Sequence, residues 1–299
     1  MAGRERVSLS DTRACGQQLA DRRRQPAPAA RTTPPSAVAT VGTFRAAAVV
    51  MSQCADPGRD SPPIIICGFP RTGTTFLQAL LNSHPEIHIS REYRFRALFA
   101  TPLLCAQAGL LHRRETEQWR GMSPDEARVS VLRALWYHGE PEGLVARRFG
   151  NKTPGNERHF WFFESVFRRT PPRYIYAARD PVAAVGSYRR MSWGEPRSVW
   201  RLSAQLGRSL RAMRRFQARH PDRLLVAALD RVATDADRRS FVQRIFRFIR
   251  ETPTREVWRF VDDWPAVNPG PGRAEASSAE PAPRPRRSLR SMQRQLGYV

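Results

Sequence analysis

Continuous apolar runs, each followed by a turn and a segment of helical periodicity, recur along this chain. The clearest runs, residues 64–67 and 173–178, lack polar alternation and are typical of strands buried on both faces of a sheet. We predict two more strands at 87–90 and 224–229, the latter in the core. Helices are predicted from residue 74, at 124–137, 156–167, 181–188, 198–219 and 237–249, and at about 288–298. The alternation predicts an α/β fold, a three-layer domain with a central parallel sheet flanked by helices.

The turn at 68–73, between the first strand and the first helix, has glycine at both ends. Free backbone N–H groups and the dipole of the following helix make such a turn an anion site. The spacing of Gly68 and Gly73 matches a Walker A loop, but Thr74 stands where that loop has lysine. The nearest cation comes earlier, at Arg71. We therefore predict a phosphate-binding turn that works without the Walker lysine.

Two segments lack any sustained period. Residues 1–60 are rich in Ala, Arg, Pro and Ser and are predicted to be a disordered extension. Because Met51 stands just before the first strand, one hypothesis is that translation starts there; an arginine-rich organelle-targeting peptide is the alternative. A mass measurement on the native protein that places its N-terminus before residue 51 would exclude a start at Met51. We assign residues 61–264 to one catalytic domain, 265–287 to a mobile Pro/Arg-rich loop, and 288–299 to a C-terminal helix of the same domain.

The chain of 299 residues has a formal net charge of +23, and Lys152 is its only lysine among 50 basic residues. Such an arginine bias is typical of GC-rich codon usage, so we attribute most of the charge to a genome effect and basic tails. The remainder favours a polyanionic ligand. The four cysteines have no CxxC spacing, which predicts a reducing cytoplasm and neither a zinc site nor a disulfide framework. No apolar run approaches the ~20 residues of a transmembrane helix.

Two further functions are open at this point. A P-loop kinase needs a lysine at position 74 and a magnesium-binding aspartate after a second strand, and Asp180 has Arg179 beside it to compete. A nucleic-acid-binding protein is suggested by the basic excess and the arginine-rich helix at 198–219, and its binding would weaken steeply with salt. The sequence contains no named nucleic-acid motif, so we expect no nucleic-acid partner.

Two motifs together resemble one enzyme family. Residues 70–75, Pro-Arg-Thr-Gly-Thr-Thr, resemble the 5′-phosphosulfate loop of sulfotransferases that use 3′-phosphoadenosine 5′-phosphosulfate (PAPS). Residues 179–181, Arg-Asp-Pro, with Ser187 shortly after them, resemble that family's 3′-phosphate motif at the matching strand-to-helix junction. The resemblance covers about residues 62–250. It implies a P-loop-like fold and makes 61–264 a sulfotransferase domain.

The resemblance also implies how the donor is bound. Arg71 would stabilise charge on the leaving phosphate, and the backbone and hydroxyls of the turn would hold the 5′-phosphate. Arg179 would bind the 3′-phosphate, with Ser187 donating a hydroxyl. A structural salt bridge of Arg179 with Asp180, and an ordinary helical serine at 187, are the alternatives. The implied donor-binding residues are Arg71, Thr72, Gly73, Thr74, Thr75, Arg179 and Ser187.

Two more segments resemble the heparan-modifying and bacterial branch of this family, which uses a glutamate base. Residues 91–95 resemble its K-E-x-x-F segment and imply Glu92 as the general base for the acceptor hydroxyl. The alternative is that Glu92 pairs with a neighbouring arginine, Arg91, Arg94 or Arg96. Residues 151–154 resemble its K-T-P segment and imply that Lys152, with Arg71, stabilises the transition state. A lysine left by chance under codon bias is the alternative.

The function implied is a bacterial, cytoplasmic enzyme that moves a sulfuryl group from PAPS to an acceptor hydroxyl by in-line attack, without a metal. Residues 93–150 are expected to form most of the acceptor pocket. Carbohydrate, glycolipid, phenol and small metabolite all remain open, with a glycan or glycolipid favoured by the glutamate-type segment. Oligomeric state is not indicated.

Several conspicuous residues receive no ligand role. Aromatic residues 161–163 are assigned to the core, and Asp230 is read as structural. The arginines near the C-terminus are read as a solvated run, because the family's G-x-x-G-x-x-K loop is missing there; they are Arg284, Arg286 and Arg287.

Overall fold

A computed structural model of the chain describes residues 61–92, 123–137, 140, 143, 146–191, 198–232, 234–263 and 287–299. The chain divides after residue 44, and every described residue belongs to the unit Arg45–Val299. The predicted extension at 1–60 lies outside the described residues. So does the predicted loop at 265–287, except for Arg287, which begins a helix.

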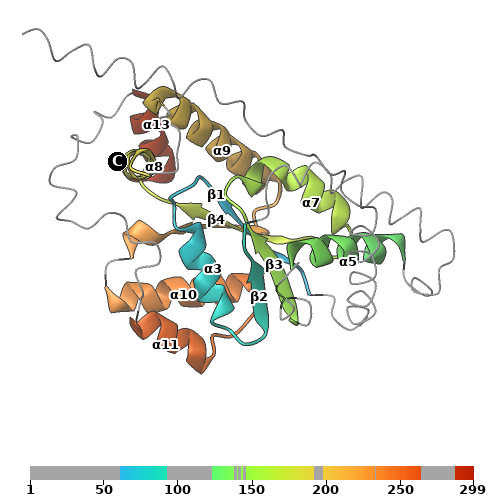
Figure 1. Cartoon of the computed structure of the whole chain (residues 1–299). Helices are drawn as coiled ribbons and strands as arrows, with labels where there is room; N and C mark the ends of the chain where they lie inside the picture. Colours follow the sequence, from blue (N-terminus) through green and yellow to red (C-terminus); the bar gives the residue numbers. More distant parts are fainter. Residues whose placement is uncertain are drawn as a thin grey trace, which may run out of the picture. The chain divides into compact units, whose positions relative to one another are not determined.

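A five-stranded sheet in which all neighbours are parallel forms the centre (Figure 1). Its order is β2-β3-β1-β4-β5. The strands are β1 (Ile64–Gly68), β2 (Ile87–Ser90), β3 (Arg148–Lys152), β4 (Arg173–Ala178) and β5 (Leu224–Ala228). Parallel strands end at the same edge of a sheet, so the segments that follow β1, β2, β3 and β4 are brought together there.

Helices cover both faces, so the predicted three-layer architecture is confirmed. On one face lie α3 (Thr74–Asn82), α10 (Asp235–Ile249) and α11 (Arg255–Asp263). On the other lie α5 (Pro124–Trp136), α7 (Phe160–Val166), α8 (Pro181–Arg189), α9 (Val199–Arg219) and α13 (Arg287–Leu296) (Figure 1). None of the described helices has both the length and the apolar character needed to cross a bilayer.

Strand β1 shows why its apolar run could be recognised. Ile64 and Ile66 are buried in the core beneath α3 and α10, while Ile65 and Cys67 are buried in the core on the opposite face. A strand covered on both sides needs apolar residues at consecutive positions rather than at alternate ones. The four side chains are fully buried, as the sequence predicted.

Several predicted elements differ in detail from the structure. The segment predicted as one helix at 156–167 is a 3-10 turn, η3 (Asn156–His159), followed by α7. Trp161 was assigned to the core, but it is 66% exposed, so that assignment is wrong. Strand β5 is the edge of the sheet and only partly buried, not a fully covered core strand. The C-terminal helix is confirmed as α13.

Two elements went unpredicted, the helix α11 and the strand β3. Strand β3 pairs with both β1 and β2 and is buried along its length, although its sequence is Arg-Phe-Gly-Asn-Lys. Polar contacts make this burial tolerable. Arg148 donates to a carboxylate oxygen of Glu251 at 3.1 Å, and Asn151 donates to Ser90 Oγ at 2.9 Å. Buried polar groups that have partners escape most of the desolvation cost.

Candidate active site

The turn after β1 is built for a close-approaching anion. Gly68 and Gly73 have φ values of 131° and 98°, and Arg71 between them has φ 70°, in the left-handed region that non-glycine residues rarely occupy. Gly73 is the N-cap of α3 and has no side chain to cap the helix. The first N–H groups of α3 therefore have no intrahelical or capping partner and point into the turn.

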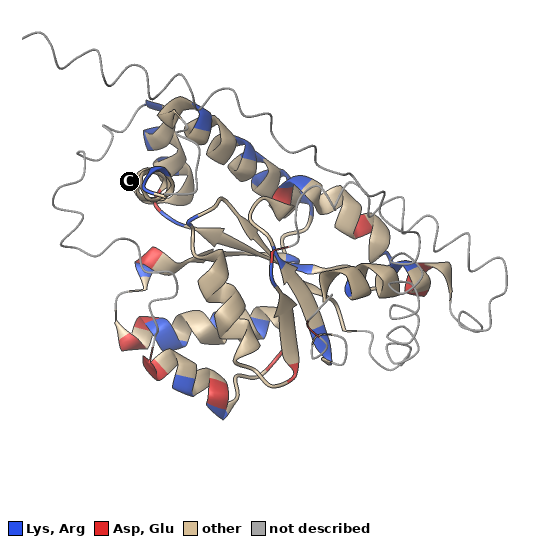
Figure 2. Cartoon of the chain, viewed as in Figure 1, with Lys and Arg blue, Asp and Glu red and all other residues tan. Residues whose placement is uncertain are grey.

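Threonine side chains line this turn. Thr72 Oγ1 donates to Phe69 O at 2.6 Å, which closes the loop on itself, and Thr74 is buried at the start of α3. Helix α3 carries no charged residue, as Figure 2 shows, so the charge of the site comes from Arg71 in the turn and from residues at the strand ends. Thr75, partly exposed, faces Lys152, whose Nζ lies 3.5 Å from Thr75 Oγ1.

The start of the turn is fixed by a residue that was not predicted from the sequence. Glu157, 2% exposed, accepts a hydrogen bond from Gly68 N at 3.0 Å, and Gly155 N donates to Gly68 O at 2.9 Å. Both polar groups of the first glycine are therefore fixed by the segment after β3. Glu157 gave no local signal, because its partner is far away in the sequence.

Three guanidinium groups gather on one side of the turn. Arg71 Nε donates to Ser187 Oγ at 3.2 Å, and Arg179 Nη1 lies 3.4 Å from Arg71 O. Burial lowers the pKa of Arg71, and the nearby charges of Arg179 and Arg190 lower it further. Within the described residues no carboxylate forms an ion pair with Arg71 or Arg179. Like charges held together without an acid favour an anionic ligand.

Asp180 and Ser187 make hydrogen bonds that concern the suggested salt bridge of Arg179 with Asp180 and the suggested role of Ser187. Asp180 does not pair with Arg179. Its Oδ1 accepts from Ala183 N at 2.9 Å and caps α8, as expected for a helix with proline at its first position. Ser187 accepts a hydrogen bond from Arg71 and keeps its hydroxyl hydrogen available for another acceptor. The structure therefore brings Arg71, Arg179 and Ser187 together beside the turn.

A second cluster lies on the other side of the turn. Lys152, at the end of β3, donates from Nζ to Glu92 Oε1 at 2.7 Å, and its side chain is 5% exposed while that of Glu92 is 56% exposed. Arg91 pairs instead with Glu140, at 3.6 Å. Arg94 and Arg96, the other suggested partners of Glu92, lie outside the described residues. The two segments meet because β2 and β3 are neighbours in register.

An amide network, also missed from the sequence, supports this cluster. Asn151 Nδ2 donates to Ser90 Oγ at 2.9 Å and to Arg91 O at 3.2 Å. Asn151 Oδ1 in turn accepts from Asn156 Nδ2 at 2.9 Å and from Thr153 Oγ1 at 3.0 Å. These bonds tie the backbone that precedes Glu92 to the residues on both sides of Lys152.

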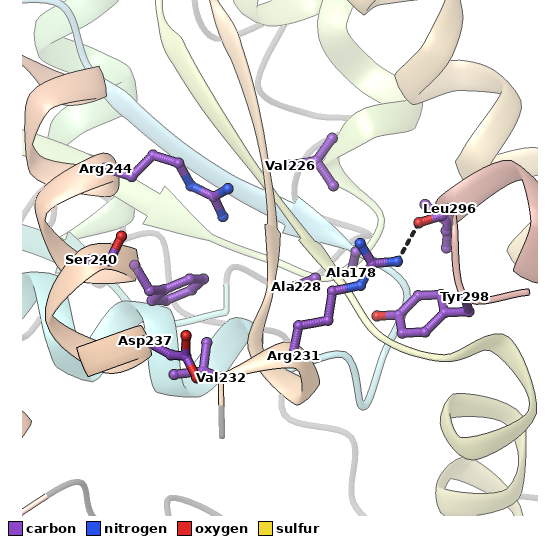
Figure 3. Close-up of a pocket in the computed structure, with 11 residues that line it drawn as sticks. Ala178, Val226, Ala228, Arg231, Val232, Asp237, Ser240, Arg244, Leu296 and Tyr298 are labelled. Atoms are coloured by element: carbon purple, nitrogen blue, oxygen red, sulfur yellow. Dashed lines mark hydrogen bonds between the residues drawn. The ribbon is translucent and has the colours of Figure 1, made fainter. Parts of the chain in front are cut away.

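A cavity of about 360 Å³ lies at the outer edge of β5 (Figure 3). It is lined by Ala178 and Ala228 at the strand ends, by residues of α10, and by Arg231 and Tyr298. None of the predicted donor-binding residues lines it. The described residues also contain no group of three or more His, Cys, Asp or Glu that could hold a metal ion.

Comparisons with known proteins find relatives and folds of one enzyme family. A profile of the sulfotransferase family matches residues 62–255. Protein-tyrosine sulfotransferase 1 of Danio rerio is 29% identical over 140 residues, which cover 43% of this chain and 36% of that protein. Protein-tyrosine sulfotransferase 2 of Gallus gallus is 30% identical over 140 residues, which cover 43% of this chain and 34% of that protein. The matched segment thus spans about a third of each of these curated relatives.

Two solved structures share the fold. They are the sulfotransferase domain of the Synechococcus PCC 7002 olefin synthase and that of the curacin biosynthetic pathway. Both are 14% identical to this chain and cover 80% of it. The first has a TM-score of 0.51 with 95% of that chain covered, and the second 0.50 with 98% covered. The profile match extends over more than half of the sequence, and this protein belongs to the sulfotransferase family.

Proposed function

We propose that this protein transfers the sulfuryl group of PAPS to the hydroxyl of an acceptor. The observation that carries the proposal is the meeting of Arg71, Ser187 and Arg179 beside a glycine turn that leads into an uncapped helix. A kinase would need a lysine at position 74, and Thr74 is a buried threonine. Family membership favours sulfuryl transfer over both alternatives, phosphoryl transfer and nucleic-acid binding.

In this proposal the donor lies across the turn. The backbone of Thr72 and Gly73 and the hydroxyls of Thr74 and Thr75 hold the 5′-phosphate. Arg179 binds the 3′-phosphate through charge-assisted hydrogen bonds, and the hydroxyl of Ser187 donates to the same group. These contacts distinguish PAPS from adenosine nucleotides that have no 3′-phosphate. The repulsion among the guanidiniums is relieved when the phosphates arrive.

The reaction is an in-line displacement. Glu92 takes the proton of the acceptor hydroxyl, the acceptor oxygen forms a bond to sulfur, and the bond from sulfur to the 5′-phosphate oxygen breaks. 3′-Phosphoadenosine 5′-phosphate (PAP) leaves with the electron pair. Arg71 stabilises charge on that phosphate and Lys152 stabilises the sulfuryl oxygens. The transferred group carries a single charge, so the proposal includes no metal ion.

The acceptor and the setting are part of the proposal too. The named relatives are protein-tyrosine sulfotransferases from animals, which adds peptidyl tyrosine to the glycan, glycolipid and small-molecule hydroxyls already considered. A cytoplasmic location and a bacterial origin stay predictions that rest on cysteine usage and on the resemblance. Cys67, the free cysteine within the described residues, is buried, and burial raises the pKa of its thiol.

A transfer assay tests the proposal. Sulfur-labelled PAPS is incubated with the protein and with a tyrosyl peptide, a phenol, a glycan and a glycolipid, with and without EDTA. We expect label on at least one acceptor, unaffected by EDTA and lost in the Arg71→Ala variant. Phosphoryl transfer from ATP and Mg²⁺ to the same panel, in place of sulfuryl transfer, would overturn the proposal.

A further inference from the structure

The C-terminal residues contact the strand ends next to the proposed 3′-phosphate site. Helix α13 packs against α8 and α9, and the residues after it reach the ends of β4 and β5. Gln293 Nε2 donates to Asp180 Oδ2 at 2.6 Å, and Tyr298 Oη donates to Asp230 Oδ1 at 2.5 Å. The two contacts fall on the two aspartates that follow β4 and β5.

These two aspartates are joined to each other. Asp230 Oδ2 accepts from the backbone N–H of Asp180 at 2.7 Å. The backbone N–H of Tyr298 donates to Gln293 O at 2.8 Å. A closed circuit of hydrogen bonds therefore runs from Gln293 through Asp180 and Asp230 to Tyr298 and back to Gln293. Arg231 holds the end of α13 and Tyr298 next to Asp230. Its Nη2 donates to Leu296 O at 2.6 Å, and its guanidinium lies 4.4 Å from the centre of the Tyr298 ring (Figure 3).

The circuit acts on Arg179 through the backbone. The N–H of Asp180 belongs to the planar peptide group that also contains the carbonyl of Arg179. Fixing that N–H on Asp230 fixes the orientation of the peptide plane, and with it the direction in which the Arg179 side chain leaves the chain. Asp230 is thus one hydrogen bond, and Tyr298 two, from the peptide group that joins Arg179 to Asp180.

The circuit also occupies the acid next to Arg179. An Asp180 carboxylate without other partners would be free to form a direct ion pair with the Arg179 guanidinium. Both oxygens of Asp180 are instead occupied, by Ala183 N and by Gln293. Both side-chain donors from the C-terminal segment are neutral. Burial and the Asp230 carboxylate raise the pKa of Tyr298, so its hydroxyl stays protonated and can donate.

We infer that Gln293 and Tyr298 are positioning residues that keep Arg179 turned toward the 3′-phosphate, so that the C-terminal segment sets the preference for PAP over nucleotides without that phosphate. The inference rests on the proposed function. The Gln293 contact is only partly buried and the Tyr298 contact is exposed, which limits the effect of each one. We expect Gln293→Leu and Tyr298→Phe each to weaken PAP binding by about 3- to 10-fold, from the loss of one hydrogen bond to a carboxylate.

Isothermal titration of the full chain with PAP and with ADP tests the inference. Each variant is expected to lose PAP affinity while its ADP affinity stays within about twofold. If turnover is measured, KM for PAPS should rise while kcat changes little, because the 3′-phosphate is remote from the transferred group. Arg214→Ala is the matched control. This variant removes the hydrogen bond of 2.7 Å from Arg214 on α9 to Gln295 O on α13 but leaves the contacts of Asp180 and Asp230 in place.

The outcomes separate the inference from the proposed function. A wild-type protein that prefers PAP, with the same PAP-to-ADP ratio in both variants, would overturn the inference and leave the function intact. A ratio that falls equally in Arg214→Ala would show a general loosening of the helix and would also overturn it. A wild-type protein with no preference for PAP would contradict the proposed function itself. Asp230→Asn is measured as a further single variant. The Tyr298→Phe/Asp230→Asn double variant should then lose no more PAP affinity than the weaker-binding of its two single variants.

Discussion

The Nζ of Lys152 lies 2.7 Å from Oε1 of Glu92, although the two residues belong to different strand ends. The lysine is almost fully buried and the glutamate more than half exposed. The ammonium therefore stands between the glycine turn, where it approaches Thr75, and a carboxylate that opens to solvent. In the proposed function, Glu92 is the base that meets the acceptor and Lys152 is the cation next to the donor.

Removing the carboxylate should abolish most of the turnover. For Glu92→Gln we expect kcat to fall by about 10²- to 10⁴-fold, the usual contribution of a general base, while PAP affinity changes little. Steady-state kinetics and PAP titration measure the two effects. Glu140→Gln is the matched control, because Glu140 is a nearby carboxylate that pairs with His88 and Arg91 away from the turn. Equal losses in the two variants would contradict the role of Glu92.

Lys152 should resist replacement by arginine. The buried ammonium has room for a compact charge, and a planar guanidinium has a different shape and hydrogen-bond geometry. We expect Lys152→Arg to lower kcat by about tenfold or more and Lys152→Met to lower it further. Unchanged turnover in Lys152→Arg would mean that the only lysine of the chain stands there by chance.

Arg179 should discriminate between nucleotides. We expect Arg179→Ala to weaken PAP binding by about 10- to 100-fold, the loss of hydrogen bonds to a charged group, and to change AMP binding far less. The free variant should melt at the same temperature as the wild type or higher, because one of three repelling guanidiniums is gone. Equal losses for PAP and AMP would remove the 3′-phosphate assignment.

Gly73 should not tolerate a side chain. A Cβ there would lie 2.2 Å from Cδ1 of Leu229, and the φ of 98° is strained for any L residue. We expect Gly73→Ala to destabilise the protein by about 1–3 kcal/mol and to weaken PAP binding. Gly186→Ala in α8 is the control. Its Cβ would meet only ordinary contact at 3.6 Å, and alanine in a helix should stabilise by up to about 1 kcal/mol. Chemical denaturation of both variants measures the difference.

The parts of the fold that could be predicted are those in which apolar residues follow one another because burial is the only requirement at each position. The strands at 64–67 and 173–178 are apolar on both faces because both faces are buried. Strand β3 could not be predicted in the same way, because Arg148, Asn151 and Lys152 are buried through specific partners rather than through hydrophobicity. Local composition carries no record of such partners.

The residues of the candidate site also divide into those that could be predicted from the sequence and those that could not. Arg71, Arg179 and Lys152 stand in short motifs, so their positions on the two sides of the turn could be predicted from the sequence together with the family resemblance. Glu157 and Gln293 stand in no motif. Their contacts with Gly68 and Asp180 join positions that are far apart in the chain and meet only after the sheet has formed. Only the folded structure shows that Glu157 contacts the first glycine of the turn and that Gln293 contacts the residue after Arg179.

The most direct measurement for the central claim is a calorimetric titration of the full chain with PAP, ADP and ATP–Mg²⁺ at one ionic strength. We predict that PAP binds at least about tenfold more tightly than either competitor, because only PAP reaches both the turn and Arg179. PAP at 100 times its Kd should stabilise the fold by about 2.7 kcal/mol in a parallel melt. Binding of ATP–Mg²⁺ in preference to PAP, or no binding of PAP at all, would contradict the account.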